Sequence, residues 1–288
     1  MIRRETTHTA VSELTLSEFY SDYGTITEPR NATRLRSREA REESMADPRM
    51  PGWYAGLRNL ADARRVLESG WSEGARRLAE CANEISPPGA RSRKRRTRFS
   101  DTGDELDVDR AMRGDWDNAW RTTRREWTPG PSHVTVFAPF GGSCVRSADE
   151  MFWAGAAALV IADRLESAGY AVRVVGAHVV NSNADNERRA LRNDIVLKES
   201  SEPLQIDALA AVLCHAGIVR TFGFSALASI PADIGEGLGH EATIESRRVD
   251  FEAGGELPEG AIVVGAVRTR EQCLAEIARV VQSLGTTE

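Results

Sequence analysis

Apolar residues in the second half of the chain alternate between short strand-like runs and long helical segments. A run at residues 134–140 ends in a Gly-Gly-Ser turn, and an apolar helical segment follows at residues 151–166. Gly169 then indicates a helix end, and a second apolar run covers residues 170–175. Two apolar runs joined by a helix are typical of a β-α-β unit with buried parallel strands.

The same alternation continues to the end of the chain. It predicts a doubly wound α/β domain at residues 131–288, with a mostly parallel sheet and helices on both faces. The glycine-rich segment 223–258 has no clear period. The predicted elements are helices at residues 148–168, 204–217 and 271–284, and strands at residues 134–140, 170–180, 194–198, 218–222 and 262–267.

The first half of the chain predicts two further regions. Residues 1–50 are polar and charged, and we expect an extended arm. Residues 51–130 are predicted to be a helical region that begins with a helix at residues 53–69. Gly70 ends that helix, and a second helix at residues 71–85 would complete an αα-hairpin. A Thr-Pro-Gly-Pro sequence marks the boundary with the α/β domain.

Composition limits the classes of function that the chain can have. Of its 288 residues, 41% are apolar, which is enough for a substantial core. The formal net charge of −6 argues against a protein devoted wholly to nucleic acid. Because the chain has no long apolar run and no apolar signal-peptide core, we expect no membrane partner and a cytoplasmic location.

The four cysteines are scattered and show no metal-ligand spacing. Cys214 and Cys273 lie in apolar helical segments, which predicts buried free thiols. Cys144 follows the glycine turn, and a nucleophilic role is the alternative for this residue.

A basic run at residues 91–98 is the strongest charge feature. Three interpretations are open: a solvated linker, a nucleic-acid contact, or a contact with an acidic protein surface, including the chain's own acidic stretch at residues 101–109. The candidate nucleic-acid residues are Arg91, Arg93, Lys94, Arg95, Arg96 and Arg98.

Three tryptophans follow the basic run at helical spacing. On a helix, Trp116, Trp120 and Trp127 would form one stripe, which predicts an interaction face that packs against a neighbouring domain. A platform for stacking nucleic-acid bases is the alternative.

The loop after the first strand of the β-α-β unit is the candidate ligand site. Backbone amides of its glycines and the N-terminus of the next helix favour an anion or a small ligand. The loop contains neither a P-loop motif nor the G-x-G-x-x-G motif of dinucleotide-binding proteins. The rest of the sequence shows no recognisable catalytic motif. The candidate anion- or ligand-binding residues are Gly141, Gly142, Ser143, Arg146 and Asp149.

The same stretch resembles the start of von Willebrand A-like domains, especially those similar to a cobalt-chelatase subunit. In those domains a strand runs into an Asp-x-Ser-x-Ser metal loop, and here Pro139, Gly141 and Ser143 occupy the three ligand places. The chain also resembles uncharacterised proteins of tailed phages and plasmids that carry a Gly-Trp-x-Glu-Gly element, present here at residues 70–74. The resemblance implies a degenerate, metal-less von Willebrand A-like domain and carries no established activity.

We therefore expect a non-catalytic binding or assembly protein of a phage or mobile element, with no cofactor and no metal. Its partner would be a protein, possibly a second copy of the chain, and its location would be the host cytoplasm or the virion. A nucleic-acid-binding accessory protein that uses residues 91–98 is one alternative. An enzyme that uses the loop at residues 141–149 for a phosphate or a metal is the other.

Overall fold

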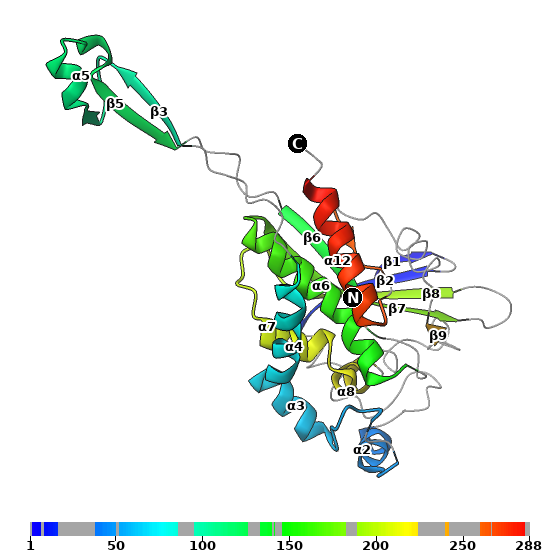
Figure 1. The fold of residues 1–288 in the computed structure, drawn as a ribbon. Coiled ribbons are helices and arrows are strands. Elements are labelled where there is room, and N and C mark those ends of the chain that lie inside the picture. The colour runs from blue at the N-terminus through cyan, green and yellow to red at the C-terminus, as the bar shows by residue number, and fades with distance from the viewer. Residues whose placement is uncertain are drawn as a thin grey trace. The chain divides into compact units, whose positions relative to one another are not determined.

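The chain forms two compact units, one made of residues 1–88 and 133–288 and the other of residues 89–132 (Figure 1). The computed structural model describes residues 2–6, 9–16, 38–49, 52–85, 95–125, 133–139, 141, 146–182, 189–223, 240–241, 260–265 and 267–285.

A mixed seven-stranded sheet forms the base of the larger unit, and its main path has the order β1-β2-β8-β7-β6-β10. β2 pairs with β8 in parallel, and β6 pairs in parallel with both β7 and β10. β1 is antiparallel to β2, and β7 is antiparallel to both β8 and β9. The strands are β1 (Ile2–Thr6), β2 (Thr9–Thr15), β6 (His133–Pro139), β7 (Ala171–Ser182), β8 (Arg189–Lys198), β9 (His240–Glu241) and β10 (Ile262–Val263).

The predicted β-α-β unit is confirmed. β6 leads into α6 (Ala148–Ser167), which returns the chain to β7 in parallel register. Ser147 caps the helix: the backbone N–H of Glu150 donates to Ser147 Oγ, while the backbone N–H of Ser147 donates to the Glu150 carboxylate. The helix ends just before Gly169, whose φ of 91° suits glycine.

The helix α6 is buried on nearly all sides, which explains why its sequence is apolar without a polar face. It contacts β6 and β7, and it also contacts α4 (Ser72–Asn83), α7 (Ile206–Leu213) and α12 (Arg270–Gly285), as Figure 1 shows. The remaining described helices of this unit are α2 (Arg38–Ala46), α3 (Leu60–Ser69), α8 (Ala216–Ile218) and the π-helical turn η3 (Val219–Gly223).

Both faces of the central strands are buried. Residues at alternate positions, including Val136 and Val174, join the large core that contains α6. The intervening Phe137, Val175 and Ala177 form a separate cluster with the partly buried Ala261 and Val263. Burial on both faces explains the continuous apolar runs of β6 and β7.

Glycines allow the helices to approach one another closely. A Cβ at Gly155 of α6 would lie 2.4 Å from the carbonyl oxygen of Leu213 in α7. Gly70 and Gly74 belong to the Gly-Trp-x-Glu-Gly element: Gly70 lies against Asp207, and a Cβ at Gly74 would lie 2.2 Å from the Trp71 ring. The backbone N–H of Trp71 donates to the carbonyl of Asp207 (3.0 Å), so this element joins the α3–α4 hairpin to the start of α7.

The smaller unit is built on an antiparallel sheet of order β3-β5-β4. Its strands are β3 (Arg95–Ser100), β4 (Glu105–Leu106) and β5 (Trp120–Arg125). The short helix α5 (Val108–Met112) and the 3-10 turn η1 (Trp116–Asn118) lie between β4 and β5 in the chain.

Two predictions about the first half of the chain are wrong in part. The arm expected at residues 1–50 contributes β1 and β2 to the sheet, because β2 gains backbone hydrogen bonds along seven residue pairs with β8. The helical region expected at residues 51–130 contains α3 and α4, but residues 95–125 form mainly strands and turns. The threonines among the arginines of β3 and β5 favour this outcome, since threonine is a good strand former.

Two predictions about the sheet also need correction. The expected short strand at residues 218–222 is helical, because α8 runs into η3. The sheet is mixed, since β8 is antiparallel to β7, the strand that precedes it in the chain. None of the described helices is long and apolar enough to cross a membrane, although the bent pair Ile206–Leu213 and Ala216–Gly223 reaches that length and apolar character together.

Substitution of Gly155 by alanine should destabilise the larger unit. The new Cβ would clash with the backbone of Leu213, and overpacking of this kind typically costs about 1–3 kcal/mol. Chemical denaturation measures the loss. Gly52→Ala is the matched control, because nothing lies within 4 Å of a Cβ at that position. Equal stability of the two variants would contradict the close helix contact.

Candidate functional site

The N-terminus of α6 lies at the carboxyl edge of β6, where α/β proteins commonly bind ligands. Glu150 closes the capping box with Ser147 and also pairs with Arg146, with 3.3 Å between Nη1 and Oε1. The backbone N–H of Ser147, followed by the side chains of Ser147 and Arg146, lowers the pKa of Glu150. These groups therefore stabilise the start of the helix.

Asp149 is bound on both of its carboxylate oxygens. Arg77 of α4 donates to Oδ1 at 2.5 Å, and the indole N–H of Trp153 donates to Oδ2 at 2.9 Å. The guanidinium of Arg77 also lies over the ring of Phe152, 3.6 Å from its centroid. Asp149 thus joins α4 to α6.

A buried arginine lies beside this edge. Arg220 is 3% exposed and donates hydrogen bonds to the backbone carbonyls of Trp53 and Arg146. Its guanidinium is 4.6 Å from the Trp53 ring centroid. Arg220 therefore links η3 both to the turn before α3 and to the segment before α6.

His215 lies in an apolar environment next to this network. It is 4% exposed, and its ring centroid is 4.8 Å from that of Trp71. Among the described residues, no hydrogen-bond partner reaches its Nδ1 atom. Burial lowers the pKa of His215 to about 4, so the ring is neutral near pH 7.

The structure describes only part of the predicted ligand loop. Gly141 has a φ of 104°, and Arg146 and Asp149 are engaged as above. Gly142, Ser143 and Cys144 lie outside the described residues. Within the described part of the chain, no three histidine, cysteine or acidic side chains are grouped so that they could hold a metal ion.

The part of the predicted basic run that the structure describes lies in a β-ribbon. Arg95, Arg96 and Arg98 belong to β3, whereas Arg91, Arg93 and Lys94 lie outside the described residues. In the antiparallel register with β5, Arg95 is opposite Arg125 and Arg96 is opposite Arg124. The next two pairs are Thr97 with Thr123 and Arg98 with Thr122. All eight residues of this segment are therefore arginine or threonine, and we call it the arginine ribbon.

The acidic stretch contacts the other end of the smaller unit. β4 pairs with β5 only at Arg121 and Trp120, beyond the arginine ribbon. Glu105 forms an ion pair with Arg121, and Oδ2 of Asp107 is 3.8 Å from Nε of Arg110. The described ion pairs thus connect the acidic residues with arginines outside the ribbon.

The predicted tryptophan stripe is wrong. Trp116 belongs to the turn η1, Trp120 begins β5, and Trp127 lies outside the described residues. Because Trp116 and Trp120 do not belong to one helix, the stripe expected from helical spacing does not form. Trp116 is 61% exposed, and the other large exposed apolar side chains among the described residues also belong to the smaller unit: Leu106, Val108 and Met112.

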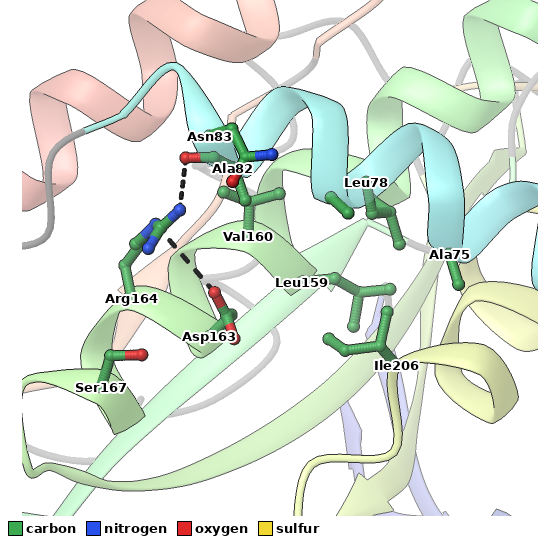
Figure 2. A pocket seen from close by; sticks show the side chains of 11 residues that line it. Ala75, Leu78, Ala82, Asn83, Leu159, Val160, Asp163, Arg164, Ser167 and Ile206 are labelled. Carbon is green, nitrogen blue, oxygen red and sulfur yellow. Dashed lines mark hydrogen bonds and ion pairs between the residues drawn. The ribbon is translucent and has the colours of Figure 1, made fainter.

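A cavity of about 380 Å³ lies between α4 and α6 (Figure 2). Apolar side chains such as Leu78, Leu159 and Ile206 line one end, and Arg164 with its polar neighbours lines the other. Arg164 donates to the backbone carbonyl of Ala82 in the last turn of α4. Its charge therefore stabilises a helix C-terminus and fixes α4 on α6.

Sequence reasoning missed four arginines that matter here. Arg121, Arg124 and Arg125 come from a second basic segment, and their signal was the repeated arginine and threonine pattern on both sides of an acidic turn sequence. Arg77 and Asp149 are 72 residues apart in the sequence, so no local sequence pattern could predict their contact.

The fold and this register define a mixed α/β protein that carries a separate β-unit with an arginine ribbon. The chain belongs to the family described as a domain of unknown function (DUF7192), whose sequence model matches residues 8–288. No curated protein and no solved structure matches the chain.

Replacement of His215 by glutamine should flatten the pH dependence of stability between pH 6.5 and 4. The unfolded state binds a proton on this histidine below pH 6.5, whereas the folded state resists it until about pH 4. The neutral His215 therefore makes its full contribution to the free energy of unfolding above pH 6.5. This free energy falls by about 3 kcal/mol as the pH drops through this window.

Denaturant unfolding at a series of pH values measures this effect as the difference between the wild type and the variant. His133→Gln, at an exposed position of β6, is the matched control. Parallel pH profiles for the wild type and His215→Gln would refute the assignment.

Proposed function

We propose that this protein is a non-catalytic nucleic-acid-binding protein and that the arginine ribbon contacts the phosphate backbone. The observation that carries the proposal is the register of β3 and β5, which brings five arginines together within four residue pairs. Three more basic residues, Arg91, Arg93 and Lys94, precede the ribbon directly in the sequence.

The energetics of the ribbon support an anionic partner. Like charges directly opposite each other across an antiparallel pair destabilise a sheet by roughly 0.2–1 kcal/mol. The ribbon contains two such pairs in succession, Arg95 with Arg125 and Arg96 with Arg124. A bound polyanion would offset this repulsion, because each phosphate contact neutralises a cation and releases a counterion.

The shape of the ribbon supports a duplex as the form of nucleic acid. The major groove of a DNA duplex admits a two-stranded antiparallel β-ribbon. β4 covers β5 only at Arg121 and Trp120, so the arginine ribbon remains two-stranded in the backbone pairing that the structure describes. Arginine-to-phosphate contacts of this kind give affinity without sequence preference.

The larger unit supports a scaffold role within this proposal. We propose that it is a degenerate, doubly wound von Willebrand A-like domain of a phage or mobile-element protein. The β6-α6-β7 crossover and Pro139 at the aspartate place of the metal motif support this view. The ion pair of Asp149 with Arg77 and its bond from Trp153 favour a structural role for that carboxylate over catalysis.

An assembly role with a protein partner, possibly a second copy, is the second candidate. The exposed side chains Val108 and Met112, on one side of α5 at i and i+4, and the exposed Trp116 favour it. If this candidate is correct, substitution of the ribbon arginines should not change the affinity of the protein for nucleic acid.

Binding to a labelled DNA duplex should weaken steeply with salt and should be insensitive to sequence. Replacing Arg95, Arg96, Arg124 and Arg125 together by glutamine should reduce the slope of log K against log salt by roughly 3–4, at about 0.9 per phosphate contact. Fluorescence anisotropy across a salt series measures the slope.

Two control variants separate charge at the ribbon from overall charge. The same four positions substituted by lysine should retain the salt slope. Glutamine at four exposed positions of the larger unit, Arg58, Arg64, Arg65 and Arg76, changes the net charge equally and should leave the slope nearly intact. A slope unchanged by the ribbon substitution would reject nucleic-acid binding and favour the assembly role.

Magnesium and manganese should show no saturable binding in calorimetry. Pro139 has no carboxylate and Gly141 has no hydroxyl, so two of the three oxygen ligands of the related metal loop are replaced. Micromolar binding that disappears in Ser143→Ala would show that the loop still holds a metal.

A further inference from the structure

Two cysteines far apart in the sequence meet in the core of the larger unit. Cys81 of α4 and Cys273 of α12 are separated by 192 residues, and their sulfur atoms are 3.9 Å apart. Both side chains are buried, and both are free thiols. The contact brings a thiol of α4 and a thiol of α12 together.

An ion pair holds the same two helices together beside the thiols. Arg270, in the first turn of α12, pairs with Glu84 just after α4. Arg270 lies three residues before Cys273 and Glu84 three residues after Cys81, so each charge is about one helical turn from a thiol. The helix pair is thus fixed by a polar contact as well as by the core.

We propose that Cys81 and Cys273 form a modification site, a dithiol that a hydroperoxide oxidises to a disulfide between α4 and α12. The sulfur atoms must approach each other by about 2 Å to reach the length of a disulfide bond, which is close to 2.05 Å.

The reaction balances with hydrogen peroxide as the two-electron oxidant. The Cys81 thiolate attacks one peroxide oxygen, the O–O bond breaks, and a sulfenic acid forms while the other oxygen leaves as water after protonation. The Cys273 sulfur then attacks the sulfenic sulfur, the S–O bond breaks, and a second water leaves with the thiol proton. Two thiols and one peroxide thus give one disulfide and two waters.

The environment supports Cys81 as the attacking sulfur. The hydrogen bond with Cys273, followed by the positive charge of Arg270, lowers the pKa of Cys81, while burial and Glu84 oppose this. The same hydrogen bond and burial raise the pKa of Cys273. Cys214 contrasts with the pair, because burial raises its pKa strongly and disfavours the thiolate.

The double variant Cys144→Ser with Cys214→Ser leaves Cys81 and Cys273 as the remaining thiols of this chain. After treatment with hydrogen peroxide and removal of the excess, the protein is unfolded and alkylated with N-ethylmaleimide. We expect an intact mass lower by two hydrogen atoms, no alkylation, and a cross-linked peptide containing Cys81 and Cys273. Dithiothreitol should reverse the change, and the disulfide should raise the melting midpoint by roughly 5–15 °C.

The single variants Cys81→Ser and Cys273→Ser are the matched controls and should not form an intramolecular disulfide. Peptide mapping of the oxidised wild type gives the same readout if the double variant does not fold. Two alkylated thiols, a sulfinic acid at Cys81, or a disulfide between two copies of the chain would each overturn the proposal. DNA binding is not part of this readout, so failure here leaves the arginine ribbon untouched.

Discussion

The structure of the larger unit depends on the burial of α6, a helix that is apolar on nearly all sides. Such a helix cannot remain at a surface, so it must be covered by the sheet on one side and by other helices on the rest. α4, α7 and α12 cover the helix side of α6, and each of them packs directly against it. The glycine at position 155 and the pair Arg77–Asp149 set two of these approaches.

The smaller unit follows a different rule. Its ribbon has little apolar surface to bury, and two of its cross-strand pairs, Arg95 with Arg125 and Arg96 with Arg124, place like charges opposite each other. Backbone hydrogen bonds, the cation–π contact of Arg110 with Phe99, and the ion pair of Glu105 with Arg121 stabilise the end away from the ribbon. The like-charge pairs and these stabilising side-chain contacts thus lie at opposite ends of the β3–β5 pair.

The parts that the sequence predicted correctly are those in which burial leaves a local pattern. The run at residues 134–140, Gly169 and the apolar segment at residues 151–166 predicted β6, α6 and the start of β7. β1 and β2 could not be predicted this way, because they join the sheet through backbone pairing of β1 with β2 and of β2 with β8, which leaves no local apolar alternation in the sequence. In the candidate site, the arginines of β3 were visible as a charge run, but only the register with β5 brought Arg124 and Arg125 opposite them.

The antiparallel register of the ribbon has a consequence for how the smaller unit is joined to the larger one along the chain. Arg95 and Arg125 are partners, so the chain enters and leaves the smaller unit at neighbouring points, about 5 Å apart between Cα atoms. The unit is therefore a nested insertion between α4 and β6, and its presence does not require the larger unit to change its connections. An insertion with adjacent ends can be acquired, exchanged or lost as a cassette while the parent domain keeps its fold.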